Sequence, residues 1–211
     1  MLLVEHIKNK PWFILILFHV VGLLGILSPY KDWFLLLTPF NLILSLTVVL
    51  LNHRGFTNKF ILFCIGIFIA GYLVEWLGIH TGLIFGEYSY GKTLGPKLFF
   101  VPVVIGVNWL MLVYSTGVVS QDIIKSTIPS ALLGAVMMTG LDFLIEPVAI
   151  KYDFWSWANR VPPLQNFIAW YVISFVFLFI FNKTNVYYQN KASYWLLGVQ
   201  LTFFSVLFIL Q

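Results

Sequence analysis

The chain has 211 residues, of which 60% are hydrophobic and only 9% are charged, and its mean hydropathy is +0.93. A soluble domain carries roughly a quarter charged residues, so this composition indicates an integral membrane protein. The twelve Lys and Arg residues give a net charge of +4 but stand singly along the chain, which excludes a basic patch for nucleic acid. The single cysteine, Cys64, excludes a disulfide framework and a cysteine-rich metal site.

Seven apolar windows follow one another, each near the roughly 20 residues that a transmembrane helix needs. They cover residues 11–28, 33–51, 60–79, 98–119, 127–149, 164–181 and 194–210. The windows lack the two-residue alternation of barrel strands. The predicted fold is therefore all-α, a polytopic integral membrane bundle of about seven transmembrane helices, in one membrane domain over residues 1–211.

The first window is expected to remain as a helix, because the run ends without the small-residue cleavage site of a signal peptide. With seven spans, the side of the N-terminus and the even-numbered loops holds seven Lys and Arg residues, and the other side holds five. This bias predicts a cytoplasmic N-terminus.

Two connections on the opposite side differ from the rest. Residues 80–97 mix glycines with aromatic residues, as a structured or re-entrant element does. Residues 151–163 carry Trp155-Ser156-Trp157 and Pro162-Pro163. In an alternating topology, both connections lie on the non-cytoplasmic side.

Three carboxylates fall inside predicted helices: Glu75 in the third, and Asp142 and Glu146 in the fifth. An ionisable group in hydrocarbon costs several kcal/mol, about 2.5–3.5 for Asp, which favours a functional role. The helix ends near these residues face the same side, and the spacing of Asp142 and Glu146 puts both on one helical face. The asparagines Asn108 and Asn166 can join this cluster. An aromatic wall is expected around it, formed by Phe85, Tyr88, Tyr90, Trp109, Trp155, Trp157, Phe167 and Trp170.

Carboxyl groups paired in an apolar pocket suit acid–base chemistry, because one can donate a proton while the other accepts one. The alternative is that these acids only hydrogen-bond neighbouring helices. His19 and Asn41, each alone in its helix, are expected to make such helix-packing hydrogen bonds. His80 is expected to be structural, with a proton relay to Glu75 as the alternative.

This chain lacks the residues that three other classes of membrane protein need. A di-iron hydroxylase needs a histidine cluster, and the four histidines are scattered. A retinal protein needs a Schiff-base lysine in its last helix, and residues 194–210 contain none. A prenyltransferase needs two acid-rich motifs and basic residues for diphosphate, and the Asp142–Glu146 pair resembles only one of them.

Two segments resemble the membrane carotenoid biosynthesis family, whose members hydrate γ-carotene or bisanhydrobacterioruberin. Residues 75–90 read EWLGIHTGLIFGEYSY and are similar to the family pattern E-x-x-G-x-x-T-G-x-x-F-G-x-Y-x-Y. The second segment contains Asp142-x-x-x-Glu146-Pro147, Trp155-Ser156-Trp157 and then Asn166 and Trp170. The family more often has Asp where this chain has Glu146, a change that keeps the carboxylate. The motif-bearing core covers about residues 75–170.

The resemblance implies a hydro-lyase that adds water to the terminal C=C bond of a ψ-end carotenoid and forms a tertiary hydroxyl, with no cofactor and no metal. It also implies an integral protein of the bacterial or archaeal cytoplasmic membrane that takes an apolar carotenoid from the bilayer lipid. Water and other enzymes of the pathway are its further expected partners.

In our mechanistic hypothesis, the catalytic residues are Asp142 as the acid, Glu75 as second choice, and Glu146. The expected substrate-binding residues are Phe85, Tyr88, Tyr90, Asn108, Trp109, Trp155, Trp157, Asn166 and Trp170. Two alternatives stay open: a carotenoid end-group cyclase, which traps the same cation with an internal alkene, and a non-enzymatic carotenoid-binding or transport protein.

Overall fold

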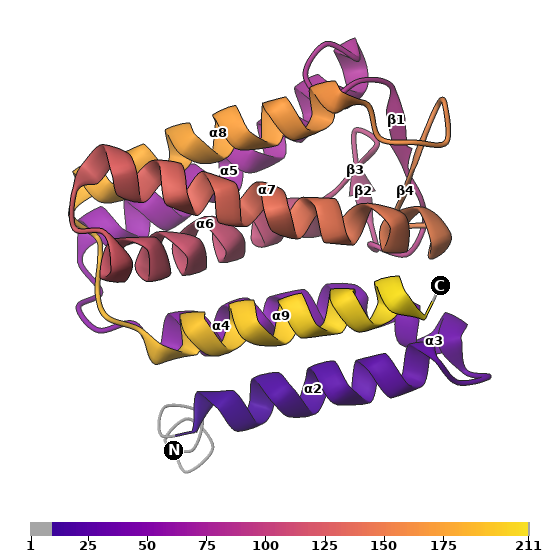
Figure 1. Cartoon of the computed structure of the whole chain (residues 1–211), viewed down its shortest axis with the longest axis horizontal. Coiled ribbons are helices and arrows are strands. Elements are labelled where there is room, and N and C mark those ends of the chain that lie inside the picture. Colours follow the sequence, from indigo (N-terminus) through magenta and orange to yellow (C-terminus); the bar gives the residue numbers. More distant parts are fainter. Residues whose placement is uncertain (1–9, 211) are drawn as a thin grey trace.

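The computed structural model describes residues 10–210, so Lys8 and the first residues of the chain lie outside the described part. Helices make up most of it (Figure 1). They are α2 (Pro11–Ile26), α3 (Lys31–Leu36), α4 (Thr38–Leu51), α5 (Asn58–Thr81), α6 (Val104–Ile123), α7 (Thr127–Lys151), α8 (Leu164–Thr184) and α9 (Lys191–Ile209). The short strands are β1 (Tyr88–Tyr90), β2 (Lys97–Leu98), β3 (Val101–Pro102) and β4 (Trp155–Trp157).

The structure confirms the all-helical bundle but not the count of about seven spans. Among the described residues, five helices are long and apolar enough to cross a membrane, namely α5 to α9. The apolar helices α2 and α4 have 16 and 14 residues, fewer than the roughly 20 that a span needs.

Two predicted windows have different boundaries in the structure. The window 33–51 divides at Leu37 into α3 and α4, and Pro39 lies in the first turn of α4. Proline favours this position because it has no N–H to donate to the preceding turn. The window 98–119 is helical only from Val104, because residues 97–102 form the hairpin β2–β3.

Helix α6 forms the centre of the bundle. Fifteen of its 20 residues are buried, and it packs against α4, α5, α7, α8 and α9. Helix α2 lies at the periphery, against α9 and α4 (Figure 1). The helices run roughly along one axis, so the connections gather at two ends of the molecule (Figure 1).

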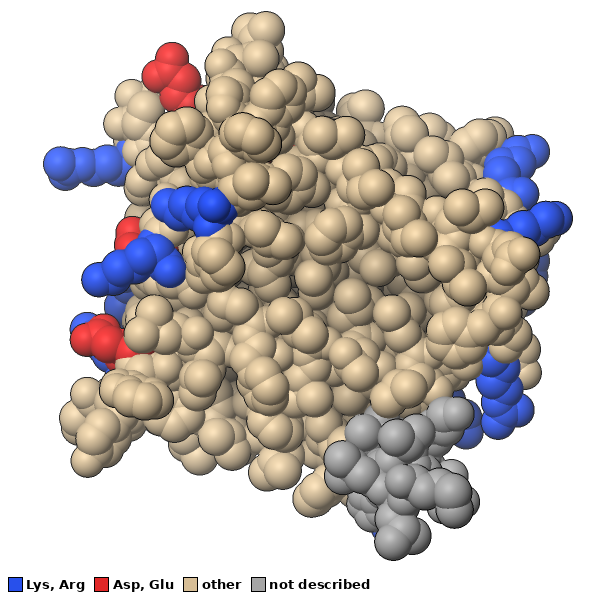
Figure 2. All heavy atoms as spheres, turned by 180° about the vertical axis from the view of Figure 1, so that it is seen from behind, with Lys and Arg blue, Asp and Glu red and all other residues tan. Residues whose placement is uncertain are grey.

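Charged residues follow the same division. On the face shown in Figure 2, Lys and Arg lie at the two ends, and a broad band without charge separates them. Many large apolar side chains of the helices are exposed, such as Leu62 on α5 and Phe143 on α7. This band and the long apolar helices fit an integral membrane protein.

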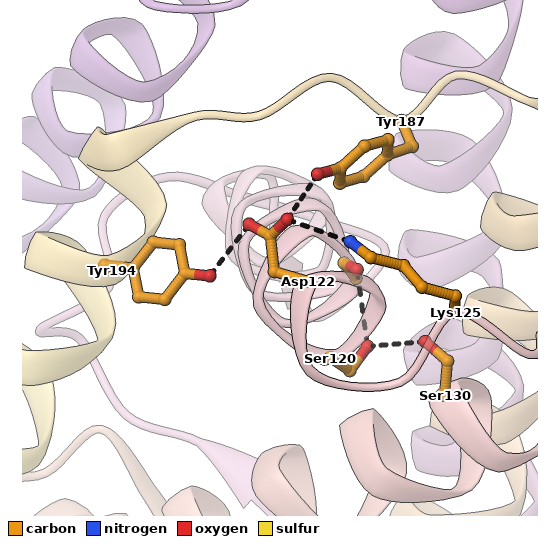
Figure 3. Close-up of polar contacts among 7 residues, drawn as sticks. Ser120, Asp122, Lys125, Ser130, Tyr187 and Tyr194 are labelled. Carbon is orange, nitrogen blue, oxygen red and sulfur yellow. Dashed lines mark hydrogen bonds and ion pairs between the residues drawn. The ribbon is translucent and has the colours of Figure 1, made fainter.

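A polar cluster holds the bundle together at the end that contains the connection between α8 and α9 (Figure 3). Asp122, near the end of α6, accepts hydrogen bonds from the hydroxyls of Tyr187 and Tyr194 and pairs with Lys125 at 3.4 Å. Burial and the hydrogen bond to Asp122 raise the pKa of Tyr187 to about 12. The Asp122 carboxylate therefore connects α6 with α9 and with the segment that precedes α9.

The opposite end carries a two-stranded antiparallel ribbon. The predicted structured element in residues 80–97 contributes β1, and the connection after α7 contributes β4. Tyr88 is opposite Trp157, and Tyr90 is opposite Trp155. The pairing brings together two connections that are some 65 residues apart in the chain, next to the ends of α5 and α7 where the carboxylates lie.

Candidate active site

The β1–β4 ribbon turns one face toward the bundle. Successive side chains of a strand point to opposite faces, so Tyr88 and Tyr90 share a face with Trp155 and Trp157. The serines between them, Ser89 and Ser156, are exposed on the other face, with their hydroxyls 3.2 Å apart. The Tyr-Ser-Tyr and Trp-Ser-Trp sequences therefore place four aromatic rings over the end of the helical bundle.

Glu75 lies beneath this ribbon and is almost completely buried. Its Oε2 accepts hydrogen bonds from the hydroxyls of Tyr88, at 2.6 Å, and Tyr90, at 2.8 Å. Its Oε1 accepts one from Nε1 of Trp109, at 2.9 Å. Burial and the Glu75 charge raise the pKa of Tyr88 and of Tyr90 well above the usual range, so both phenols remain donors. Three donors thus fix the Glu75 carboxyl in one position.

Glu146 is held in a similar way by the other strand of the ribbon. Its Oε2 accepts hydrogen bonds from Nε1 of Trp157, at 2.7 Å, and of Trp155, at 3.1 Å. Its Oε1 is 3.3 Å from Nδ2 of Asn166. An indole N–H can only donate, so Oε2 of Glu146 acts as an acceptor.

Asp142 lies one turn before Glu146 on α7 and shares the same amide. Nδ2 of Asn166 donates to Oδ2 of Asp142 at 2.9 Å. Among the described residues, the hydrogen bonds of Asp142 involve Oδ2 alone. Asn166 therefore connects two buried carboxyl groups, and Oδ1 of Asp142 is the oxygen that can carry a proton without breaking a hydrogen bond.

A small cavity of about 30 Å³ lies between these groups. A site of this size holds about one water molecule, which needs roughly 10–15 Å³ or more. Its walls are formed by Glu75, Phe85, Tyr88, Tyr90, Ile105, Asn108, Glu146, Trp155, Trp157, Asn166 and Trp170. The structure thus brings the two glutamates, both asparagines and six aromatic residues to one place.

Several predicted residues lie beside the cavity rather than on its wall. Asp142 lies behind Asn166. Trp109 hydrogen-bonds Glu75 and stacks on Trp170, with ring centroids 4.4 Å apart. Phe167 is not part of the wall, because its ring packs on the lipid-facing Phe143, 5.6 Å away.

The proton relay through His80 finds no support in the geometry. Nδ1 of His80 is 2.8 Å from the backbone oxygen of Trp76, one turn earlier in the same helix, and the ring is exposed. The described residues include no group of three or more His, Cys, Asp or Glu side chains that could hold a metal ion.

Residues that support the ribbon were not predicted from the sequence. Nζ of Lys97 donates to the backbone oxygen of Tyr90 at 2.5 Å, and the amide of Gln165 donates to the backbone oxygen of Leu83 at 2.6 Å. A Cβ at Gly78 would come 2.7 Å from the ring of Phe85. The alternation in Tyr-Ser-Tyr and Trp-Ser-Trp was the available signal for the strands.

Comparison with known proteins agrees with the motifs at this site. The model of a family described as carotenoid biosynthesis protein matches residues 34–211 and so includes the carboxylates. Bisanhydrobacterioruberin hydratase of Haloarcula japonica is 26% identical over 129 residues, which are 54% of this chain and 42% of the hydratase. The chain thus spans less than half the length of this relative. No solved structure matches the chain.

Proposed function

We propose that the chain, which belongs to the carotenoid biosynthesis protein family and is similar to a bisanhydrobacterioruberin hydratase, is a carotenoid hydratase. It adds water across the terminal C=C bond of a linear ψ-end carotenoid and leaves a tertiary hydroxyl. The observation that carries the proposal is the small cavity lined by Glu75, Glu146, two asparagines and six aromatic residues. Tyrosines and tryptophans of the ribbon hydrogen-bond the two glutamates there.

The reaction needs an acid, a water molecule and a base. Protonation of the alkene gives a tertiary carbocation, the oxygen of water attacks it, and the resulting oxonium loses one proton. The proton comes from the Asp142/Glu146 pair, whose two carboxyls share the amide of Asn166. The proton released by water returns to the same pair, so the net change is the addition of one water molecule.

This assignment changes the role of Asp142 from sole acid to one member of a pair. Glu146 lines the cavity and can reach the substrate, whereas Asp142 lies behind Asn166. Because the two carboxyls are coupled through one amide, the proton belongs to the pair rather than to either residue.

Glu75 suits a different task. With three hydrogen bonds from fixed donors, it is a preorganised negative charge that opposes the positive charge of the cation. The faces of Trp155, Trp157 and Trp170 add about 0.5–2 kcal/mol each where they meet a desolvated cation. Asn108 lines the cavity and holds the attacking water together with Asn166.

The polyene needs an apolar surface that leads to this cavity. A groove of about 590 Å³ between α5 and α8 opens toward the lipid and ends at Phe177, whose ring packs on Trp109 at 5.5 Å. On α8 the groove runs from Phe177 to Asn185, roughly 12 Å at 1.5 Å per residue, so it covers the half of the helix away from the carboxylates. In this proposal the groove holds the distal part of the polyene, and the reacting end group enters between the aromatic rings of the cavity.

Expression in cells that accumulate lycopene or γ-carotene tests the proposal. Mass spectrometry of the extracted carotenoids should show products heavier by one water. A product of unchanged mass but altered retention and absorbance would instead identify an end-group cyclase. Unchanged carotenoid that co-purifies with the protein would identify a binding protein, and either result would overturn the hydratase proposal.

A further inference from the structure

A second cavity lies between α2, α4 and α9. Its volume is about 310 Å³, within the range of small-molecule sites. Apolar and aromatic side chains form most of its wall, and the polar residues are His19, Thr38, Asn41 and Gln200. None of its described lining residues is Asp, Glu, Lys or Arg. The cavity is therefore an apolar pocket with a few neutral polar groups.

Two of these polar groups have no partner among the described residues. Gln200 is 4% exposed, and its Oε1 is buried without a hydrogen bond. Oδ1 of Asn41 is also buried without a hydrogen-bond partner among the described residues. A buried polar group without a partner costs about 1–3 kcal/mol, and lipid offers no water to satisfy it. The sequence predicts a helix-packing hydrogen bond for Asn41, and its Oδ1 has none among the described residues.

His19 adds an acceptor. Its Nδ1 lies 2.8 Å from the backbone oxygen of Leu15, in its own helix rather than in a neighbouring one. Because a carbonyl oxygen only accepts, Nδ1 carries the proton, and Nε2 of the neutral ring is an acceptor. The pocket thus offers two amides, each able to donate and accept, and one imidazole nitrogen that accepts.

We propose that this pocket binds the hydroxyl end of a long apolar alcohol. A hydroxyl can donate its one proton to an unpartnered amide oxygen, Oε1 of Gln200 or Oδ1 of Asn41, and can accept a hydrogen bond from the NH₂ group of the other amide. A phosphate or carboxylate would lack a counter-charge here and would offer these oxygens no proton, and a plain hydrocarbon would leave both amide oxygens without a donor. The side chains of Phe18 and Phe40, 6.0 Å apart and exposed toward lipid, line the pocket where the hydrocarbon chain would enter.

Two sources supply such an alcohol: a carotenoid with a tertiary hydroxyl end, and a prenol of the membrane. The pocket also contains Phe154, which directly precedes β4 and the ribbon over the carboxylates. This position places the pocket at the same end of the molecule as the candidate active site.

The test measures ligand binding to the purified full-length chain in detergent. Thermal unfolding is followed with increasing amounts of geranylgeraniol or of the hydrocarbon with the same skeleton. Because a ligand of the folded state raises the Tm according to its affinity, the two series give relative affinities. The alcohol should bind about tenfold more tightly, the worth of a net hydrogen bond. Equal affinities would overturn the proposal and leave a pocket for acyl chains.

Gln200→Leu should reduce the affinity for the alcohol to that for the hydrocarbon, without lowering the Tm of the ligand-free protein. The matched control is Ser193→Ala, which also removes an unpartnered buried polar atom from α9 but lies outside the pocket. An unchanged preference for the alcohol in Gln200→Leu would contradict the proposal. Should that variant fail to fold, Asn41→Leu gives the same comparison.

A third series with a hydroxylated carotenoid distinguishes the two sources. Tighter binding of this carotenoid than of geranylgeraniol assigns the pocket to the carotenoid, and the reverse assigns it to a prenol. All of these series measure binding and none depends on turnover, so the pocket proposal and the hydratase proposal can fail separately.

Discussion

The amide of Asn166 gives the two acids of α7 a common hydrogen-bond donor. Removing one carboxyl therefore changes the surroundings of the other, and their effects on the reaction should not add. Glu75 is independent of this amide because its three donors come from β1 and α6. The site consequently has one proton-holding pair and one separate fixed charge.

We predict that Asp142→Asn and Glu146→Gln each lower conversion by about 10²–10⁴-fold, the usual contribution of a positioned acid. The double variant should lose little more than the worse single variant. Mass spectrometry of hydrated product per folded molecule measures this. The control is Asp122→Asn at the other end of the bundle, which should lower the Tm but not conversion. Near-normal conversion in both α7 variants would refute the role of the pair.

The tryptophans of β4 have two functions that substitutions can separate. Trp157→Phe keeps an aromatic face but loses the N–H that donates to Glu146, whereas Trp157→Leu loses both. Trp170 makes no hydrogen bond to a carboxylate among the described residues, so Trp170→Leu tests the aromatic face alone.

We predict that Trp157→Leu lowers turnover more than Trp157→Phe, by the roughly 0.5–2 kcal/mol that a cation–π contact contributes. Trp170→Leu should show a loss of similar size. Turnover per folded molecule is measured together with the Tm, because a purely structural tryptophan would change only the Tm. If all three variants turn over at the rate of the unsubstituted protein, these tryptophans contribute to packing and not to stabilisation of the cation.

At the scale of elements, the ribbon shows what the sequence could and could not predict. The carboxylates meet because Glu75 and Glu146 each lie near the end of an apolar helix, and alternating topology places these ends on one side. Hydropathy and helical geometry are enough to predict that the two glutamates lie at the same end of the bundle. The pairing of β1 with β4 depends on contacts between residues far apart in the chain, which local patterns do not specify.

The rotation of each helix about its own axis could not be predicted from local sequence patterns either. Asp142 and Glu146 share a helical face, yet only Glu146 lines the cavity, and Asp142 is instead hydrogen-bonded to Asn166 of α8, which does line it. The aromatic Phe167 immediately follows Asn166 but turns to Phe143 and the lipid. Which side chains of a helix face the cavity depends on how neighbouring helices pack against it.

Two glycines test the groove between α5 and α8. A Cβ at Gly66, which lines the groove, or at Gly140 on α7 would meet no atom within 4 Å. We predict that Gly66→Phe fills the groove and lowers both binding and conversion of a long carotenoid by about tenfold or more. A short terpenoid with the same ψ-end, which does not reach Gly66, should be converted at an unchanged rate.

Gly140→Phe is the matched control, because it adds the same side chain to an exposed position outside the groove. Binding is measured by the change in polyene absorbance on addition of protein, and conversion by product mass. If both glycine variants behave alike, the groove holds only lipid, and the polyene reaches the carboxylates by another route.

At the scale of the whole molecule, the two ends have different charge. Among the described residues, the end with the α8–α9 connection holds six Lys and Arg residues and one acidic residue, Asp122. The ribbon end, which carries the candidate active site, holds five Lys and Arg residues together with Asp32, Glu87 and Asp153 in or beside its connections. Cytoplasmic connections have an excess of Lys and Arg. We therefore predict that the ribbon and its carboxylates face the non-cytoplasmic side.

Single cysteines make this orientation measurable. With Cys64→Ser as background, Lys92→Cys at the ribbon end and Lys125→Cys at the other end are each treated in whole cells with a membrane-impermeant maleimide. Lys92 and Lys125 are both exposed in connections between helices, so the reagent can reach either cysteine from its own side. Labelling of Lys92→Cys alone is the expected result, and both should react after the cells are permeabilised. Labelling of Lys125→Cys alone would invert the topology and place the carboxylates at the cytoplasmic surface, where water for the reaction would enter from the cell interior.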